Sequence, residues 1–398
     1  MDKSLILVVN PGSASHKYAL FSGVKLMANI IFEFVDGAVV GKIDFNGQQR
    51  VAKCSDLNLS SVVRYVLPLL HQFEVIGATD KIDVVGVRLV APSERFAKDE
   101  LVTDDIKVEL EAVKQRAPLH AKTVQQEVSQ LRTYLSDTPI VLISDSAFHS
   151  TKPAKAWYYG IDIELADKID VRRYGYHGIS VGSVVHNLQE HNILSPKTII
   201  CHLGSGSSIT AIENGLSIDN SMGYTPLEGV MMATRSGTID VSAALAIKKE
   251  LQLNDDELEE YLNRNSGLLG VSGSSNDIRQ LVTSEERGDS KAKLALEMYV
   301  YRIQQAIGQM VASLGGVDCI VFTATVGERS SLIRGRILDN LGYLGFTYDK
   351  PKNDKVFEPT EIINISTNPD KPILVISTDE AVEIARRTQQ YFKAMDKA

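Results

Sequence analysis

Short runs of apolar residues alternate along the chain with longer segments in which apolar positions recur at helical spacing. The short runs cover residues 4–9, 82–90, 139–144, 197–203, 318–324 and 371–377. Runs of this length are typical of buried strands. The clearest helical pattern covers 290–314 and ends at Gly315, and a last helix is expected near 380–395. The alternation predicts an α/β protein with mixed sheets and helices packed on them.

Two segments about half a chain apart share one plan of strand, Gly/Ser-rich turn and strand. They are "ILVVNPGSASHKYALF" at 6–21 and "IICHLGSGSSITAIE" at 199–213. Two domains of related structure would explain this repeated pattern, and a chance match of two hairpins is the alternative. The length of 398 residues also favours two domains over one core. We expect the chain to cross between the domains near 150–170.

Composition narrows the class of protein. The net charge is −8 and both signs are spread along the chain, which argues against a general nucleic-acid or membrane binder. The three cysteines, Cys54, Cys201 and Cys319, are far apart and form no C-x-x-C pair. A disulfide framework or a zinc site is therefore not expected, and a reducing cytoplasm fits. No segment reads as a signal peptide or as a membrane span.

The two Gly/Ser turns are candidate anion sites. Glycine lets backbone N–H groups approach a phosphate closely, and serine hydroxyls add donors. Neither turn is a P-loop of the G-x-x-x-x-G-K-[ST] type. An ordinary hairpin turn is the alternative for each.

Two further stretches carry candidate catalytic groups. In "LISDSAFHS" (142–150), Asp145 follows an apolar strand, where its carboxylate can orient an attacking oxygen or hold a metal; capping the next turn is the alternative. In "RRYGYHGIS" (172–180), His177 lies between two glycines, and its imidazole can donate to a charged transition state. A hydrogen-bonded structural histidine is the alternative there.

Three charged residues stand in surroundings that call for a partner. Arg88 lies within an otherwise apolar run, and Arg235 lies in a Thr-Arg-Ser-Gly turn. A desolvated guanidinium needs an anion, which is either a protein carboxylate or a carboxylate or phosphate of a substrate. Glu380 follows a strand end, where it either binds Mg²⁺ or favours the start of the last helix.

Taken in order along the chain, these stretches resemble the acetokinase family, the family of the acetate kinases, which shares its fold with actin, Hsp70 and the sugar kinases. The resemblance covers nearly the whole chain. It is densest in "DSAFH" (145–149), "RRYGYHG" (172–178), "CHLGSGSSI" (201–209), "SMGYTPLEGVMMATRSG" (221–237) and "STDE" (377–380).

The resemblance implies a two-domain, actin-like (ribonuclease-H-like) fold with a central cleft. The domains would be residues 1–150, completed by the C-terminal helix 382–398, and residues 151–381. It also implies the reaction: reversible, Mg²⁺-dependent (or Mn²⁺-dependent), in-line transfer of a phosphoryl group from ATP to acetate, giving acetyl phosphate and ADP. A homodimer formed through the second domain is implied as well.

Residue roles follow from the resemblance by matching motifs. Arg88 and Arg235 would hold the carboxylate and the transferring phosphoryl group, His177 would stabilise its equatorial oxygens, and Asp145 would orient the acetate. Metal ligands would be Asn10 and Glu380, and the acetate methyl would contact Val90, Leu119, Tyr176 and Pro226. The phosphates would meet Ser13, Ser15, Lys17, His202, Gly204, Ser205 and Gly206. The nucleoside would meet Asp277, Ile278, Arg279 and the loop Ala324, Thr325, Val326, Gly327 and Glu328.

Departures from the family pattern leave alternatives open. Thr325 and Arg329 stand in "TVGER" where the family has Gly-Ile-Gly-Glu-Asn, and a branched side chain there narrows the nucleoside site. Pyrophosphate is therefore an alternative donor to ATP. The first turn begins Asn-Pro-Gly-Ser, as in butyrate kinases, so propionate and butyrate are alternative acids. A non-catalytic ligand-binding member is the third reading, although Arg88, Asp145, His177, Arg235 and Glu380 are all present.

Overall fold

The structure is a computed structural model that describes residues 3–12, 15–35, 38–54, 59–116 and 118–395. The side chains of residue 53 and of residues 115, 116 and 118–121 are also outside this description. The chain divides into two compact units: unit 1 comprises Met1–Ala147 and Asp379–Ala398, and unit 2 comprises Phe148–Thr378. The sequence predicted boundaries at 150 and 381. No helix within the described ranges is both long enough and apolar enough to cross a membrane.

Unit 1 is built on a sheet of eight strands in the described residues, ordered β5-β4-β3-β2-β1-β6-β8-β7. The strands are β1 (Leu5–Pro11), β2 (Ser15–Ser22), β3 (Lys25–Val35), β4 (Ala38–Phe45), β5 (Gln48–Lys53), β6 (Val84–Leu89), β7 (Glu100–Leu101) and β8 (Ile140–Ser144). Strands β1 to β5 form an antiparallel meander, whereas β6 runs parallel to both β1 and β8. The carboxyl ends of β1, β6 and β8 therefore meet at one edge of the sheet.

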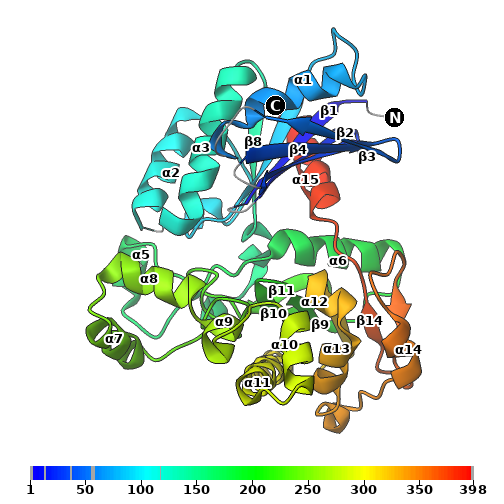
Figure 1. Cartoon of the computed structure of the whole chain (residues 1–398). Helices are drawn as coiled ribbons and strands as arrows, with labels where there is room; N and C mark the ends of the chain where they lie inside the picture. Colours follow the sequence, from blue (N-terminus) through cyan, green and yellow to red (C-terminus); the bar gives the residue numbers. More distant parts are fainter. Residues whose placement is uncertain (1–2, 13–14, 36–37, 55–58, 117, 396–398) are drawn as a thin grey trace. The chain divides into compact units, whose positions relative to one another are not determined.

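Helices cover both faces of this sheet. They are α1 (Val63–Gln72), α2 (Asp104–Arg116), α3 (Pro118–Tyr134) and α15 (Glu380–Met395), with short 3-10 turns at Leu59–Ser61 and Glu94–Phe96. One face forms a core with α1, α2 and α3, and α15 packs along β1, β6 and β8 (Figure 1). The approach is close at Gly86, where a methyl group would overlap the Thr388 hydroxyl. The C-terminal helix thus completes unit 1.

Unit 2 contains a sheet of six strands within the described part of the chain, ordered β11-β10-β9-β12-β14-β13. The strands are β9 (Lys197–Leu203), β10 (Ser207–Glu213), β11 (Leu216–Asn220), β12 (Cys319–Thr323), β13 (Ile363–Asn364) and β14 (Ile373–Val375). The helices are α4 (Ala154–Trp157), α5 (Ile163–Lys168), α6 (Gly178–Glu190), α7 (Val241–Glu250), α8 (Asp255–Arg264), α9 (Gly267–Ser272), α10 (Ile278–Glu286), α11 (Ser290–Leu314), α12 (Ala324–Arg329), α13 (Ser331–Leu338) and α14 (Lys350–Lys355), with 3-10 turns at Ala147–Thr151 and Gly342–Leu344.

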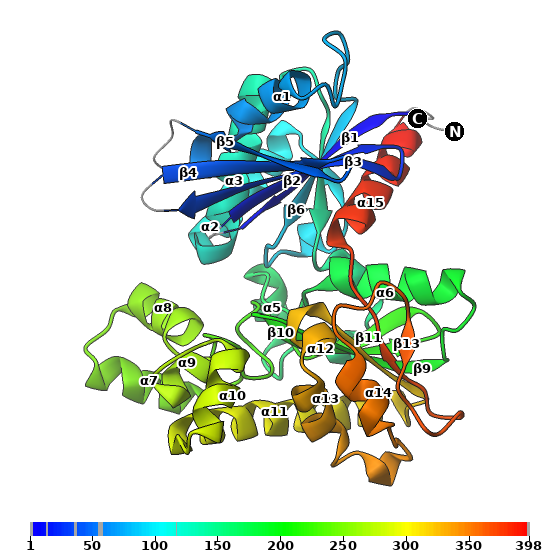
Figure 2. The same ribbon diagram turned by 45° about the vertical axis from the view of Figure 1, so that its right-hand side comes forward.

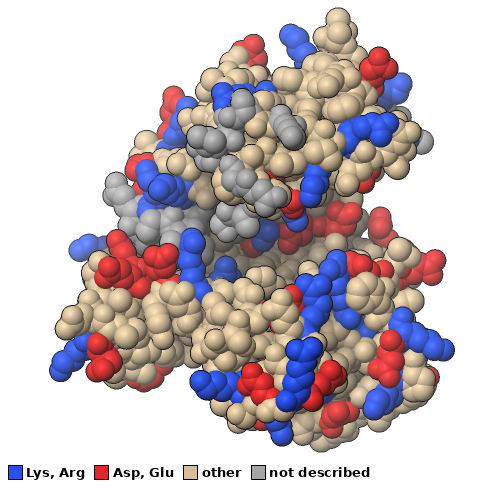
Figure 3. Space-filling view, in the orientation of Figure 1, with Lys and Arg blue, Asp and Glu red and all other residues tan. Residues whose placement is uncertain are grey.

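The unit 2 sheet also lies between helices. Helix α6 covers one face, and α10, α11 and α13 cover the other (Figure 2). Helix α11 has the bounds that the apolar pattern predicts. Asp289 caps its N-terminus through the N–H groups of Lys291 and Ala292, and Gly315 ends it in the left-handed conformation with φ of 62°. On the face shown in Figure 3, acidic and basic side chains are intermixed over unit 2.

Unit 2 buries one lysine. Lys152 is 4% exposed, and its ammonium donates to the Arg173 carbonyl at 2.6 Å and lies 5.0 Å from the centre of the Trp157 ring. Burial, with a smaller contribution from the charge of Arg173, lowers the pKa of Lys152 from 10.5 to about 7 against the attraction of Asp219 and Glu228.

This lysine predicts a pH-dependent stability. Between pH 7 and 10.5 the unfolded chain binds the proton and the folded chain does not, so the free energy of unfolding rises with pH by up to ~1.4 kcal/mol per unit. Lys152→Met removes this dependence, and its melting temperature should exceed that of the native protein most at pH 6 and least at pH 9. Exposed Lys155, replaced in the same way, is the control. An equal Tm difference at pH 6 and pH 9 would contradict the prediction.

Candidate active site

Three predicted site residues of unit 1 meet at the carboxyl edge of its sheet. Arg88 stands in β6 opposite Ile143 of β8, Asp145 follows β8 directly, and Glu380 opens α15. Arg88 Nη2 donates to Asp145 Oδ2 at 3.1 Å, and Arg88 Nη1 donates to Glu380 Oε2 at 2.9 Å. Asn10, at the end of β1, donates from Nδ2 to the same Glu380 oxygen at 3.2 Å. The parallel strands and the returning helix thus gather four distant residues into one cluster.

In this cluster one guanidinium, that of Arg88, faces two carboxylates, those of Asp145 and Glu380. Asp145 is 1% exposed, so its carboxylate depends on Arg88 for compensation. Burial by itself lowers the pKa of Arg88, but attraction by Asp145 and Glu380 outweighs this and raises that pKa above its usual value. Protein carboxylates are therefore the anionic partners of Arg88 in this structure. Its two hydrogen bonds, one from Nη1 and one from Nη2, use two of the five N–H groups of the guanidinium, and its buried Nε has no acceptor among the described residues.

The first Gly/Ser turn connects β1 to β2. Gly12 N–H donates to the Ser15 carbonyl at 2.9 Å, which closes the turn. Asn10 pairs with Lys17 across the antiparallel ladder, so both side chains leave the same face of the sheet. Ser13 lies outside the described residues. Val90 is half-buried just after β6, and Leu119 lies in the first turn of α3, where its side chain is not described.

In unit 2, two histidines stack beside the second Gly/Ser turn. The rings of His177 and His202 lie 4.1 Å apart, centre to centre, with 25° between their planes. His177 Nδ1 is 3.0 Å from Ser208 Oγ, and His202 Nδ1 is 2.7 Å from Ser180 Oγ. His177 directly precedes α6 and has a φ of 61°, a strained conformation for a residue other than glycine. The hydroxyls orient both rings, so the Nε2 atom of His177 is presented on the side of the turn.

Arg235 reaches the same turn from the loop after residue 221. A methyl group built on Gly206 would lie 3.1 Å from His177 Nε2 and 3.2 Å from Arg235 Nη1. The imidazole and the guanidinium therefore converge on the glycine of the turn. The Arg235 backbone packs against Gly267, where φ of 61° and contact with Arg235 backbone atoms leave no room for a side chain.

Two residues predicted for the acetate pocket lie near Arg235. The Pro226 carbonyl is 3.5 Å from Arg235 Nη1, and the Tyr176 hydroxyl donates to the Tyr224 carbonyl at 2.6 Å. Both Tyr176 and Pro226 are buried. The structure therefore places Pro226 against Arg235 and ties Tyr176 to the segment that carries Pro226, whereas Val90 and Leu119 belong to unit 1.

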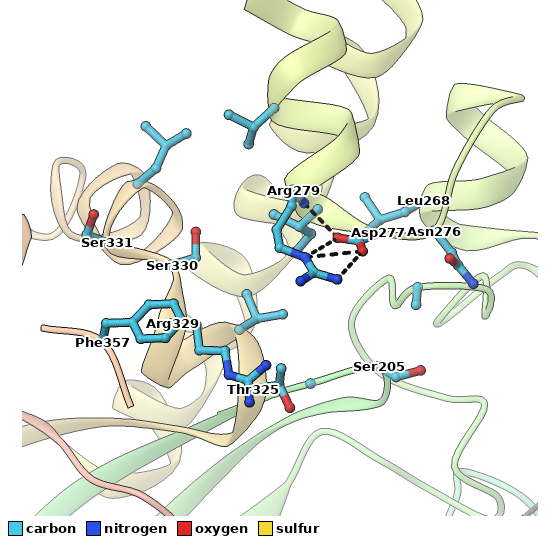
Figure 4. Close-up of a pocket in the computed structure, with 16 residues that line it drawn as sticks. Ser205, Leu268, Asn276, Asp277, Arg279, Thr325, Arg329, Ser330, Ser331 and Phe357 are labelled. Carbon is cyan, nitrogen blue, oxygen red and sulfur yellow. Dashed lines mark hydrogen bonds and ion pairs between the residues drawn. The ribbon is translucent and has the colours of Figure 1, made fainter. Parts of the chain in front are cut away.

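A cavity of about 590 Å³ opens beside the second turn, within the range of small-molecule sites. It is lined by Gly204, Ser205, Ala233, Leu268, Asn276, Asp277, Ile278, Arg279, Val282, Thr325, Val326, Arg329, Ser330, Ser331, Leu332 and Phe357. Figure 4 shows Arg279 extending from α10 and Arg329 from α12. Asp277 accepts from Arg279 Nη2 at 2.6 Å and also caps α10, and the hydrogen bonds from Arg279 lower the pKa of Asp277.

The sequence analysis predicted a loop at 324–328, and this prediction is wrong. These residues form helix α12, which begins at Ala324 with φ of 65°. The apolar strand before it and the small residues within it gave no helical period long enough to recognise. Glu328 does not line the cavity; its carboxylate accepts from Ser377 Oγ at 3.2 Å and from Thr378 N–H at 3.3 Å. Burial raises the pKa of Glu328 against these hydrogen bonds.

The sequence analysis did not predict the residues that orient the candidate catalytic side chains. Ser208 and Ser180 orient the two imidazoles, and Gly267 seats the backbone of Arg235. Their signals were weak but present. Ser180 stands three residues after His177, one helical turn along α6, and Ser208 follows the Gly/Ser turn on the next strand.

Comparison with known proteins identifies the family of this chain. Residues 5–386 match the model of the acetokinase family. The acetate kinase of Bacillus anthracis is 37% identical over 391 residues, covering 96% of this chain and 98% of the relative; that of Clostridium botulinum (strain Langeland / NCTC 10281 / Type F) is 38% identical over 395 residues, covering 97% and 98%.

Solved structures are similar over the same length. Acetate kinase from Porphyromonas gingivalis has a TM-score of 0.86 at 32% identity, and a propionate kinase from Francisella tularensis subsp. tularensis SCHU S4 has a TM-score of 0.88 at 32% identity. Each comparison covers 97% of this chain and 99% of the other. The actin-like kinase fold expected from the sequence is therefore confirmed.

Proposed function

Because the chain belongs to the acetokinase family, we propose that it transfers a phosphoryl group reversibly between ATP and acetate, with acetyl phosphate and ADP as products. The proposal assigns the phosphoryl donor to unit 2 and the cluster of Arg88, Asp145 and Glu380 in unit 1 to acetate and metal. Phosphoryl transfer asks the protein mainly to position the reactants and to neutralise charge.

One observation carries the proposal: His177 Nε2 and Arg235 Nη1 converge on Gly206 in a turn free of bulky side chains. A phosphoryl group at this turn would accept hydrogen bonds from an imidazole and a guanidinium. Donors held in place before the reaction stabilise developing charge without reorganising at the moment of transfer. Ser208 on Nδ1 of His177 and the close packing of Arg235 on Gly267 support such fixed placement.

The unit 1 cluster suits a carboxylate acceptor that is already ionised. Acetate has lost its proton at neutral pH, so no general base is required for its attack. We assign Arg88 to holding an acetate or phosphoryl oxygen, because its hydrogen bonds to Asp145 and Glu380 use only two of its five N–H donors. Asp145, bound to Arg88, would orient the acetate rather than deprotonate it.

The residues present fit Mg²⁺. The amide oxygen of Asn10 and the carboxylates of Glu380 and Asp145 are oxygen donors, which Mg²⁺ prefers. Within the described residues no three His, Cys, Asp or Glu side chains gather into a metal cage. This agrees with an ion held by one or two protein oxygens, water and substrate phosphates. When bound, Mg²⁺ would neutralise phosphate charge, and Asn10 and Glu380 would hold it.

The cavity beside the second turn supports ATP as the donor. Thr325 lines it, yet about 590 Å³ stays open between Thr325, Arg279 and Phe357. Pyrophosphate is the second candidate donor, because Thr325 and Arg329 both occupy part of the cavity wall.

The donor is tested by a parallel assay with acetate and Mg²⁺, with ATP in one arm and pyrophosphate in the other. Hydroxylamine traps acetyl phosphate as the product. We expect turnover with ATP, because the nucleoside cavity is open. Turnover with pyrophosphate alone would reassign the donor, and no product with either would contradict the proposed reaction.

The acid has a second candidate as well. A propionate kinase has the same identity to this chain, 32%, as the Porphyromonas acetate kinase. Propionate therefore belongs in the same assay as a competing acceptor, with butyrate beside it, and the ratio of kcat/KM values decides among the three acids.

We also propose a homodimer formed through unit 2, in the cytoplasm. Supporting the dimer, helix α7 has no buried residue, and α11 exposes Leu294 and Tyr301 to about half of their surface. Supporting the compartment, Cys54, Cys201 and Cys319 are free thiols.

A further inference from the structure

One arginine in unit 2 is completely buried and takes no part in the site described above. Arg334, in the middle of α13, has no exposed surface. Its guanidinium donates five hydrogen bonds: Nε to Asn353 Oδ1 at 2.8 Å, Nη1 to the carbonyls of Gly327 and Glu328 at 2.8 and 3.0 Å, and Nη2 to the carbonyls of Asn353 and Val356 at 2.9 and 3.0 Å. A guanidinium has five N–H groups, so every one of them is used.

The four backbone acceptors stand at the C-terminal ends of two helices. Gly327 and Glu328 belong to the last turn of α12, while Asn353 and Val356 belong to the end of α14 and the residue that caps it. Carbonyls at a helix C-terminus lack their full set of intrahelical partners and carry partial negative charge. Of the four, the Asn353 carbonyl also accepts from the Val356 N–H at 3.1 Å. Arg334 therefore caps two helices at once and fixes the distance between their ends.

Both helix ends lead directly into the wall of the cavity. Thr325, Val326 and Arg329 line it from α12, and Phe357 follows Val356 immediately. Arg329 and Phe357 lie against each other in Figure 4, with the guanidinium of Arg329 5.9 Å from the centre of the Phe357 ring. Arg329 also forms an ion pair with Glu358. The wall thus combines two segments that Arg334 joins from behind.

Burying the Arg334 guanidinium without a carboxylate partner costs free energy of folding, so stability alone does not explain an arginine at this position. No ion pair joins Arg334 to a carboxylate in the part of the chain described, and burial lowers the pKa of Arg334 to about 10 despite the attraction of Asp354. Apolar side chains of similar volume commonly replace buried charges without loss of stability. An apolar residue, however, cannot hold four carbonyls of two helices in one geometry.

We propose that Arg334 is a positioning residue for nucleoside recognition, which holds α12 and the segment after α14 at the separation that forms the donor cavity. The inference rests on the proposed function in one respect, namely that the donor is a nucleotide. Without the hydrogen bonds of the Arg334 guanidinium the two segments can move apart, and contacts to the nucleoside then weaken. The phosphate turn at Gly204–Gly206, the imidazoles and Arg235 stand on other segments of the chain than the two that Arg334 joins.

The test compares Arg334→Met and Arg334→Lys with Arg336→Met in the full-length protein. Arg336 stands two residues further along α13 and forms an ion pair with Glu285 at 2.8 Å, so it controls for the loss of an arginine from this helix. Titration calorimetry with ADP and Mg²⁺ measures nucleotide binding without any need for catalysis. Initial rates then give kcat and the KM values for ATP and acetate.

We expect Arg334→Met to weaken ADP binding about tenfold and to raise the KM for ATP similarly, with much smaller changes in kcat and in the KM for acetate. Arg334→Lys, which keeps the charge but has one nitrogen for two helix ends, should fall between this variant and the native protein. Arg336→Met should bind ADP like the native protein. If Arg334→Met does not fold, Arg334→Lys carries the test alone.

Three results would overturn the inference. The first is ADP binding within twofold of native in the Arg334 variants. The second is a loss of kcat with an unchanged KM for ATP, which would mean a general effect on the fold of unit 2. The third is no ADP binding by the native protein, which would also remove ATP as donor; the first two results leave the proposed reaction intact.

Discussion

Arg235→Ala is expected to lower kcat/KM for acetyl phosphate formation by at least about a hundredfold. The guanidinium converges with His177 on Gly206, and one preorganised donor to a developing charge is typically worth 10²–10³ in rate. The alanine variant keeps the turn, the histidine stack and the Gly267 contact of the backbone, so only the charged donor is lost. The hydroxylamine assay measures the effect directly.

Arg264→Ala is the matched control for this prediction. Arg264 lies in the same unit on α8, its side chain is 57% exposed, and its nearest carboxylate oxygen, in Glu260, is 3.9 Å away. Its loss should change kcat/KM by less than twofold. If Arg235→Ala is as active as Arg264→Ala, Arg235 has no role in transfer and the assignment of the second turn to the phosphoryl group fails.

Arg88→Met is expected to reduce kcat/KM by a hundredfold or more and also to lower the melting temperature. The substitution leaves Asp145, 1% exposed, without the cation that compensates it. Breaking a buried ion pair by removing one partner costs about 3–5 kcal/mol, part of which is relieved when the carboxylate takes up a proton. Activity falls independently of stability, because the substrate oxygen that Arg88 is proposed to hold has lost its hydrogen-bond donor.

The two effects of Arg88→Met can be separated. Adding Asp145→Asn removes the uncompensated charge, so the double variant should regain most of the lost melting temperature and none of the activity. Arg95→Met is the control in the same unit: Arg95 is 45% exposed and contacts Glu100 and Asp105 outside the cluster. Recovery of activity in the double variant would show that Arg88 acts only on stability.

Much of the fold was predictable from local pattern. The six apolar runs coincide with most or all of the core strands β1, β6, β8, β9, β12 and β14, and both Gly/Ser stretches connect antiparallel strands. Helix α11 was predictable to its last residue, since Gly315 adopts the left-handed conformation that ends it. The meander strands β3, β4 and β5 were not predicted. In β3 and β4 buried positions alternate with partly exposed ones, so these strands lack the continuous buried run that marks the parallel strands.

The features of the candidate site likewise divide into those that the local sequence determines and those that depend on tertiary structure. The sequence by itself determined which residue types stand at strand ends and in turns: Asp145 after β8, Arg88 within β6, and small residues around His177 and Gly206. It also carried the motifs that identify the acetokinase family. These properties are local, since a strand end, a turn or a motif is complete within a few residues.

Only the tertiary structure decided which of these residues meet. Arg88 and Glu380 are 292 residues apart in the chain and become partners because α15 returns to pack on β6. The stack of His177 on His202 and the capping of α12 and α14 by Arg334 are contacts of the same kind. They depend on which faces are buried together, and burial is decided by the packing of whole elements, which no local pattern contains.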